Sequence, residues 1–364
     1  MSHSFGPTRF AAAQTVLEEA IAARAFPGAA YGVMLNGEIV ALGAAGRFTY
    51  DSASPEVTPS TIFDLASVTK VVATTALAML LLDRGTLSLD AYLGEILPEF
   101  VEGSSSNSDR QHVTIRSLLA HSSGLPGYAR LFEQNRTREA MLHALLRLQL
   151  EAKPGTRAEY SDIGFMLLGR ALEVLSGRSL DSMFQSEIAI PLGLATACFN
   201  PSPELRNSIP PTENDTTFRH HIIQGEVQDE NCFALGGVAG HAGLFANAQD
   251  VLRFAACILT DGKTPLGRQL FHPDTVHLFA TRQTQPTGTT RALGWDTPSR
   301  PSSSGKFFSA ESIGHLGYAG TSLWIDPVRQ LAVALLTNRT WPDRGNKTIQ
   351  QVRPAFHDAI AMAL

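Results

Sequence analysis

Apolar positions near the N-terminal end of the chain predict a helix followed by a β-hairpin. Residues 8–25 carry apolar side chains at helical spacing, and Pro27-Gly28 ends the predicted helix. Two apolar runs follow at residues 29–35 and 38–46, and Asn36-Gly37 joins them. Asn-Gly between two such runs is typical of a two-residue hairpin turn, so these runs are predicted to be paired strands.

The C-terminal end repeats this arrangement in reverse order. Residues 321–326 and 330–338 read as two strands around the turn at Asp326-Pro327, and residues 347–364 read as a closing helix. We therefore expect one antiparallel sheet built from both ends of the chain, with the terminal helices packed on it.

The middle of the chain has a helical pattern instead. Residues 67–83 read as a buried helix that Gly85 stops, and residues 103–111 read as a polar surface loop. Further helices, separated by Pro and Gly, are predicted at residues 113–120, 137–151, 162–176 and 248–259. The predicted fold class is α/β (α+β): a flanked antiparallel sheet domain from residues 1–66 and 290–364, and a mostly helical region at 67–289 inserted between its halves, with the active site at the seam.

Composition narrows the class of function. The chain has 364 residues, a net charge of −5 and an ordinary globular composition, which argues against nucleic acid or an anionic membrane as its partner. Its three cysteines are far apart, and no metal-binding or nucleotide-binding motif is complete, so we expect no metal and no cofactor. Without a signal-like N-terminus, and with its longest apolar run only at residues 71–82, the chain is expected to be cytoplasmic with no membrane segment.

The first candidate for chemistry is Ser67, followed three residues later by Lys70 at the start of the apolar helix. Residues three apart share one helix face, and a serine needs a neighbouring base to become a nucleophile. A buried lysine can be that base because burial disfavours its charged form. The alternative is a structural role, in which Ser67 caps the helix and the Lys70 side chain extends to water. A second Ser-x-x-Lys pair, Ser303 and Lys306, lies in a Ser/Gly loop with no helix to fix it, so it is discounted.

Two further patterns follow along the chain. Tyr160-Ser161-Asp162 opens an apolar helix, and His315-Leu316-Gly317 leads into a strand. A tyrosine hydroxyl beside a Ser–Lys pair can relay a proton to a leaving group, although a half-buried tyrosine is commonly structural. Glycine at a strand edge allows close approach of a ligand backbone, although a turn before a strand explains it as well.

These three motifs, in this order, resemble the signature of the serine β-lactamase and penicillin-binding-protein superfamily. The resemblance is closest to the class C-like branch, which includes D,D-peptidases, family VIII esterases and N-acetylmuramyl-L-alanine amidases. It extends over roughly residues 10–360, because the segments LLAHSSGLPGY, GGVAGHAGLF, LGWD and TSLWIDP also look like that branch. It implies a β-lactamase/transpeptidase-like fold.

The resemblance also implies roles for individual residues. Ser67 would be the nucleophile, Lys70 its base partner and Tyr160 a second proton-transfer group, with His315 on the strand that lines the site. The backbone amides of Ser67 and Tyr318 would form the oxyanion hole. The residues expected to contact substrate are Asp162, Gly317, His241 and Trp295. For His241 and Trp295, a structural role is an equal alternative.

Two departures from the family pattern affect the expected mechanism. Asp162 replaces the commoner asparagine, and a carboxylate near Lys70 would favour its ammonium form. The serine proton would then go either to Lys70 or to a tyrosinate at Tyr160, and the sequence leaves this open. His315 replaces the lysine typical of β-lactamases, which weakens the grip on a β-lactam carboxylate.

The function predicted on this basis is a serine hydrolase that cleaves an ester or amide through an acyl-enzyme at Ser67. The leading substrate is a peptidoglycan-type fragment, cleaved as by a D,D-peptidase or a muramyl-peptide amidase. Two alternatives stay open: a broad-specificity short-chain carboxylesterase, and a penicillin-binding protein that is acylated without turnover. The only partner expected is the small-molecule or muropeptide substrate.

Overall fold

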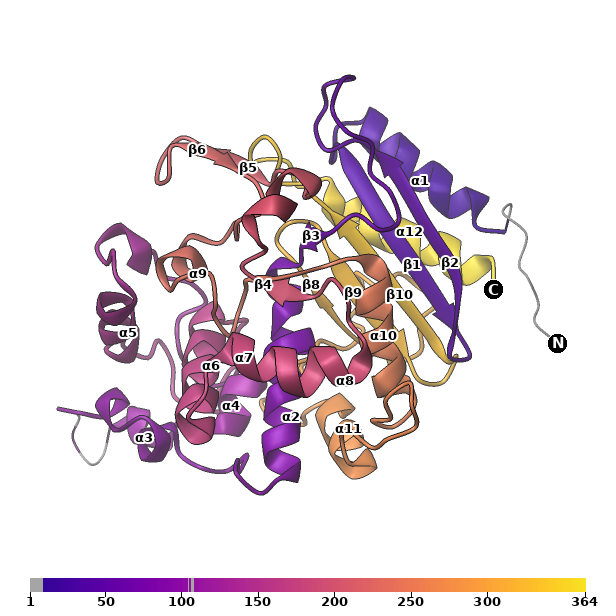
Figure 1. Cartoon of the computed structure of the whole chain (residues 1–364). Helices are drawn as coiled ribbons and strands as arrows, with labels where there is room; N and C mark the ends of the chain where they lie inside the picture. The colour runs from indigo at the N-terminus through magenta and orange to yellow at the C-terminus, as the bar shows by residue number, and fades with distance from the viewer. Residues whose placement is uncertain (1–8, 104, 106–107) are drawn as a thin grey trace.

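The two ends of the chain form one five-stranded antiparallel sheet in the computed structural model, which describes residues 9–103, 105 and 108–364 (Figure 1). The strand order is β2-β1-β10-β9-β8. The strands are β1 (Gly28–Leu35), β2 (Glu38–Gly46), β8 (Ile313–Leu316), β9 (Ser322–Asp326) and β10 (Leu331–Thr337). Pairing of β1 with β10 runs from Ala29 opposite Thr337 to Leu35 opposite Leu331. The prediction of a single antiparallel sheet built from both chain ends is therefore confirmed.

The first hairpin has the turn that its sequence predicts. Asn36 and Gly37 join β1 to β2 with positive φ angles of 52° and 82°. A type I′ turn requires positive φ at both central residues, and its twist matches that of the flanking strands.

Helices cover both faces of the sheet, because successive side chains along the strands point to opposite faces and both faces are apolar. On β10, Leu331, Val333 and Leu335 enter the outer core, formed with α1 (Ala11–Ala22) and α12 (Ile349–Met362). The intervening Ala332, Ala334 and Leu336 enter the main core on the inner face. Helix α10 (Ala248–Leu259) packs on that inner face. Its approach is close, because a Cβ on Gly32 of β1 would lie 2.6 Å from Leu252 Cδ1.

A buried helical segment runs through the centre of the molecule. It begins as a 3₁₀ turn (Ala66–Val68), continues as a π-helical turn (Lys70–Thr75) and ends as α2 (Ala76–Asp83). Residues 66–83 are long and apolar enough to cross a membrane, but 83% of that window is buried inside the protein. The segment is therefore the core helix of this fold. Gly85, with φ of +68°, follows its end as expected for a helix stop.

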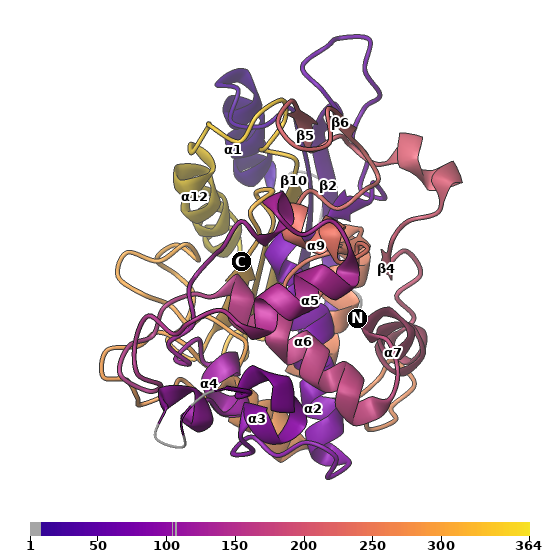
Figure 2. The same cartoon turned by 90° about the vertical axis from the view of Figure 1, so that its left-hand side faces the viewer.

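The remaining helices lie around α2, in the part of the molecule away from α1 and α12 (Figures 1 and 2). They include α4 (Ile115–Leu119), α5 (Arg138–Leu146) and α6 (Asp162–Ser176). The shorter ones are α3 (Leu93–Ile96), α7 (Leu180–Phe184), α8 (Ile190–Leu192), α9 (Glu230–Ala234) and α11 (Pro273–Ala280). The predicted helices at 162–176 and 248–259 have the observed bounds, whereas those at 113–120 and 137–151 are shorter than predicted.

The predicted surface loop at 103–111 needs a correction. Residues 104, 106 and 107 lie outside the described residues, but Asp109–His112 forms a 3₁₀ turn with Arg110 buried. The guanidinium of Arg110 donates hydrogen bonds to the carbonyls of Phe100, Leu146 and Leu148. This arginine therefore ties its own turn to the turn that ends at Phe100 and to the C-terminal end of α5, which a polar composition alone does not reveal.

Two small sheets complete the fold. One has the order β3 (Phe63–Asp64), β7 (Leu244–Ala246), β4 (Cys198–Phe199), and the other pairs β5 (Glu213–Asp215) with β6 (His221–Ile223). The first fixes the chain immediately before Ser67. The main core runs without a break from the inner sheet face into the helical region, and the predicted domain boundaries at residues 66/67 and 289/290 stay predictions.

Candidate active site

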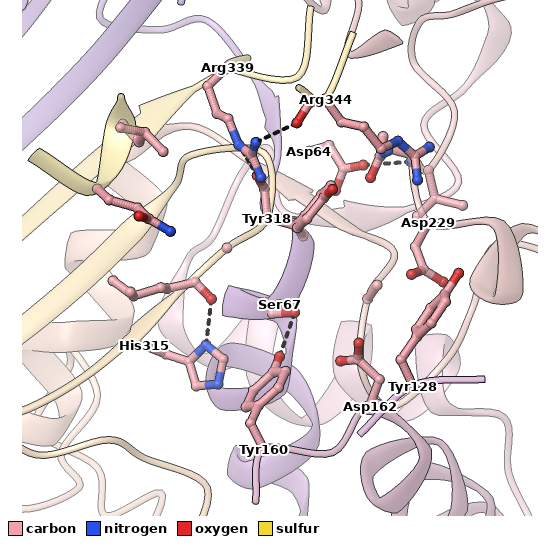
Figure 3. A pocket seen from close by; sticks show the side chains of 18 of the residues that line it. Asp64, Ser67, Tyr128, Tyr160, Asp162, Asp229, His315, Tyr318, Arg339 and Arg344 are labelled. Atoms are coloured by element: carbon pink, nitrogen blue, oxygen red, sulfur yellow. Dashed lines mark hydrogen bonds between the residues drawn. The ribbon is translucent and has the colours of Figure 1, made fainter. Parts of the chain in front are cut away.

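Ser67 lies in the first turn of the buried central segment, where the large sheet meets the helical region (Figure 3). Three hydrogen bonds fix the backbone before it: Leu65 N to Leu244 O (2.9 Å), Thr321 Oγ1 to Leu65 O (2.8 Å) and Ala66 N to Asp64 Oδ1 (2.8 Å). They hold Ala66 at a φ of +47°, in the left-handed region that a residue with a Cβ seldom adopts. Strain of this kind is concentrated at functional sites.

The Lys70 side chain is completely buried, and its Nζ meets three polar atoms. These are Ser67 Oγ at 3.0 Å, Asp162 Oδ1 at 2.7 Å and the carbonyl oxygen of His241 at 3.0 Å. The carboxylate and the carbonyl can only accept, so they take two of the nitrogen's protons. The third position faces the serine hydroxyl, where a neutral amine would present its lone pair.

Tyr160 stands on the other side of the serine, and its Oη donates to Ser67 Oγ at 2.8 Å. Its position depends on the N-terminus of α6, where Ser161 Oγ caps Gly164 N. His121 supports this turn from below: its Nδ1 accepts from Ser161 N at 3.0 Å, and its ring lies 4.8 Å from that of Tyr160. His121 was not singled out from the sequence, although it belongs to the segment LLAHSSGLPGY that carried part of the resemblance.

Burial shifts the pKa values of Lys70 and Tyr160, the two neighbours of Ser67, in opposite directions. It lowers the pKa of Lys70, and the Asp162 carboxylate opposes that effect only in part. It raises the pKa of Tyr160 well above its usual value, and Asp162 raises it further. Tyr160 is therefore uncharged, and Lys70 loses its proton more readily than an exposed lysine does.

His315 occupies the edge strand β8 and is a neutral group. Its Nδ1 lies 2.8 Å from the Leu316 carbonyl oxygen, which can only accept, so Nδ1 carries the proton. The other ring nitrogen, Nε2, is buried and has no partner among the described residues. Burial first, and then the charges of Lys70 and Arg291, lower the pKa of His315 well below its usual value. The ring is therefore an uncharged acceptor beside the site.

The turn after β8 packs tightly against the serine segment. A Cβ on Gly317 would lie 1.9 Å from Thr321 Oγ1 and 2.6 Å from Leu65 O, so only glycine fits there. Gly320 N donates to Gly317 O at 3.0 Å and closes a turn around Tyr318 and Ala319. Ser67 and Tyr318 both line the same pocket, as the predicted oxyanion hole requires.

The pocket has a volume of about 750 Å³ and is richly lined with charged and aromatic groups (Figure 3). Besides the predicted residues, it is lined by Asp64, Tyr128, Arg130, Gln228, Asp229, Glu230, Arg291, Asp296, Arg339, Arg344, Lys347, Gln350 and Arg353. None of these was predicted as a site residue, although Asp296 ends the LGWD segment and Arg291 stands two residues before that segment begins. No group of three His, Cys, Asp or Glu side chains within the described ranges is arranged to hold a metal ion.

Two residues expected to contact substrate lie behind the pocket instead. His241 is 1% exposed, and its Nε2 is 2.8 Å from Asp229 Oδ1. Its contribution to the site is its backbone carbonyl, which accepts from Lys70. Trp295 is buried and stacks on Phe254 with ring centres 6.2 Å apart. Both side chains are buried, and neither is among the residues that line the pocket.

The family is shown by comparison with known proteins. The Beta-lactamase family model matches residues 13–355, so the chain belongs to the beta-lactamase family. Among its relatives is the N-acetylmuramyl-L-alanine amidase of Bacillus subtilis, 32% identical over 89% of this chain and 79% of that protein. A putative D-alanyl-D-alanine carboxypeptidase of Escherichia coli K12 is 31% identical over 78% of this chain and 70% of its own.

Solved structures agree on the fold. EstCE1, a hydrolase with promiscuous acyltransferase activity, superimposes with a TM-score of 0.77 at 23% identity, covering 96% of this chain and 99% of its own. A penicillin-binding-protein homologue from Caulobacter crescentus gives a TM-score of 0.77 at 22% identity, covering 98% of each chain. The chain is thus a hydrolase of the beta-lactamase superfamily, and its relatives include an amidase and a putative carboxypeptidase.

Proposed function

We propose that the protein hydrolyses an ester or amide bond through a covalent acyl-enzyme on Ser67. The observation that carries this proposal is the position of Ser67 Oγ, 3.0 Å from Lys70 Nζ and 2.8 Å from Tyr160 Oη at the wall of a large pocket. A nucleophile within hydrogen-bond reach of both a base and an acid is the arrangement that acyl transfer needs.

In the acylation step, neutral Lys70 takes the proton of Ser67 as Oγ attacks the substrate carbonyl carbon. The resulting oxyanion faces the N–H groups of Ser67 and Tyr318. The bond to the leaving group then breaks, and the leaving group takes the proton of Tyr160. Acyl-Ser67, an ammonium at Lys70 and a tyrosinate at Tyr160 result, and the two charges stabilise each other.

Deacylation restores the starting state. Water gives a proton to the tyrosinate and its oxygen attacks the acyl carbon. The tetrahedral intermediate collapses, and Ser67 Oγ leaves with the proton held by Lys70. The opposite pKa shifts of Lys70 and Tyr160 support this order, because they make the lysine the better base in the free enzyme.

The substrate class that we propose is a peptidoglycan-type fragment. The named functions of the relatives in Bacillus subtilis and Escherichia coli support it. The size of the pocket and its many charged lining residues also suit a polar, multi-residue substrate better than a short acyl ester. With His315 uncharged, Arg291, whose Cζ lies 5.5 Å from the Tyr160 ring centre, is a cation of the pocket wall that could hold a substrate carboxylate.

Mass spectrometry of cleavage products tests this function. A disaccharide-pentapeptide, a muramyl-peptide and p-nitrophenyl butyrate are incubated separately with the protein and with Ser67→Ala. Loss of a terminal alanine identifies a carboxypeptidase, and separation of the sugar from the peptide identifies an amidase. Turnover of the ester alone contradicts the peptidoglycan substrate, and a single stoichiometric acylation without turnover contradicts the hydrolase.

A further inference from the structure

The turn that carries Tyr318 is held from behind through its carbonyl groups. The Arg353 guanidinium, on α12, donates to Gly317 O at 2.6 Å, Thr321 O at 2.9 Å and Gly320 O at 3.2 Å. Arg339 Nε donates to Tyr318 O at 2.6 Å. The remaining carbonyl, that of Ala319, accepts from Thr337 Oγ1 and from Arg339 N, each at 2.9 Å. Every carbonyl from Gly317 to Thr321 therefore faces a protein donor.

This arrangement fixes the direction of the Tyr318 amide. In a trans peptide the C=O of one residue and the N–H of the next point in opposite directions. Since the Gly317 carbonyl is bound to Arg353, the Tyr318 N–H points away from Arg353. A donor held in this way needs no reorganisation when charge develops opposite it, which is the source of oxyanion-hole catalysis.

The charge of Arg353 has no counter-ion. The side chain is 6% exposed, and no ion pair joins it to a carboxylate anywhere in the described part of the chain. Burial and the neighbouring Arg339 lower its pKa to about 9, so it stays cationic at neutral pH. Buried charges are normally paired, because an uncompensated one is costly. A positive charge retained beneath this turn is explained if a negative charge forms on the other side of it during catalysis.

We propose that Arg353 is a positioning residue for the oxyanion hole: it orients the Tyr318 amide and supplies uncompensated positive charge behind it. The proposal rests on the acyl-enzyme function above. We call the hydrogen bonds from Arg353 to the carbonyls of Gly317, Gly320 and Thr321 the Arg353 clamp. The proposal predicts that loss of this clamp reduces binding of the transition state much more than binding of the substrate.

The chain offers a matched control. Arg110 is 7% exposed, and its guanidinium likewise bonds to three backbone carbonyls, but it does not line the pocket. Arg353→Lys therefore removes a set of arginine–carbonyl hydrogen bonds at the pocket, and Arg110→Lys removes the same kind of set away from it. Three measurements are compared: the melting temperature, kcat and KM on p-nitrophenyl acetate, and the affinity for phenylboronic acid, which forms a tetrahedral adduct with a serine oxygen.

For Arg353→Lys we expect kcat to fall about 10- to 100-fold with KM within about twofold, and boronate affinity to fall by a similar factor, somewhat less than the loss of a whole oxyanion donor. Arg110→Lys should lower the melting temperature while leaving kcat and boronate affinity within about twofold. A folded Arg353→Lys protein with parental kcat and boronate affinity overturns the proposal. If that variant does not fold, Arg339→Lys, which removes the bond to Tyr318 O, is measured against the same criteria.

The two proposals fail in different ways. A parent protein that neither turns over the ester nor binds the boronate contradicts the acyl-enzyme function, and the clamp with it. A parent that does both, together with a clamp variant that matches it, contradicts the clamp alone.

Discussion

Asp162 Oδ1 lies 2.7 Å from Lys70 Nζ, with the lysine side chain fully buried and the carboxylate at the pocket edge. This pair sets the proton affinity of Lys70, the proposed base: burial, the larger effect, lowers the pKa of Lys70, whereas the carboxylate raises it. The carboxylate also accepts one of the lysine protons and so directs the nitrogen toward Ser67.

Asp162→Asn should therefore move the acid limb of the kcat/KM profile to lower pH. Removal of the carboxylate lowers the pKa of Lys70 further, so the amine stays neutral in more acidic solution. The rate below the parental limb should rise, by up to about tenfold for each unit that the limb moves. The check is kcat/KM on one ester from pH 5 to 9. A limb that moves to higher pH would show that the carboxylate does not act on the base in this way.

Tyr160→Phe should lower kcat about 10²- to 10⁴-fold, the usual contribution of a proton-transfer group, because the leaving group loses its proton donor. The acid limb should stay at the parental pH, since Lys70 and Asp162 are unchanged. Disappearance of that limb would instead identify Tyr160 as the base. Near-parental rates would remove Tyr160 from the mechanism altogether.

Ser67→Ala should abolish covalent labelling by a fluorophosphonate, measured as the mass of the intact protein. Ser303→Ala is the matched control, because Ser303 also precedes a lysine by three residues but lies in a loop that does not line the pocket. Its labelling should equal that of the parent. Labelling that survives in Ser67→Ala would assign the nucleophile elsewhere.

The buried His357 should make the fold sensitive to acid. Burial, with a smaller effect of Arg353, lowers the pKa of His357 to about 3, so the folded protein holds this ring neutral while the unfolded chain protonates it near 6.5. Stability from this group is present above pH 6.5 and is lost as the pH falls toward 3. Between pH 6.5 and 5 the loss is about 2 kcal/mol.

Urea unfolding at pH 7.5 and 5.0 measures this loss. His357→Phe should have a smaller difference in unfolding free energy between the two pH values than the parent. The exposed His143, which forms no ion pair in the described part of the chain, is replaced by glutamine as the control, and this variant should keep the parental difference. An unchanged difference in His357→Phe would mean that His357 does not couple folding to protonation.

The sequence was most informative where function depends on local spacing. The three-residue step from Ser67 to Lys70 and the Asn36-Gly37 turn predict contacts within one helix turn or one hairpin, and both hold in the structure. Arg353 illustrates the opposite case. Its partners lie 32 to 36 residues away, and a helix pattern does not reveal that a buried arginine faces a turn of another element.

His241 and Trp295 show a second limit. Their segments resemble those of related enzymes, which led to an expectation of substrate contact. In the structure His241 acts through its backbone carbonyl, and Trp295 fills the core against Phe254. A motif marks a place in the fold, but it does not tell whether the side chain or the main chain faces the ligand.

The pairing of β1 with β10 has a consequence for synthesis of the protein. Ser67, Lys70 and Tyr160 leave the ribosome long before Tyr318, Leu331–Thr337 and Arg353. Until then β1 lacks its central neighbour and the serine lacks the amide that would stabilise its intermediate. Under the mechanism proposed above, a nascent chain therefore carries its nucleophile before the oxyanion hole is complete, and activity requires the last strands to pair with β1.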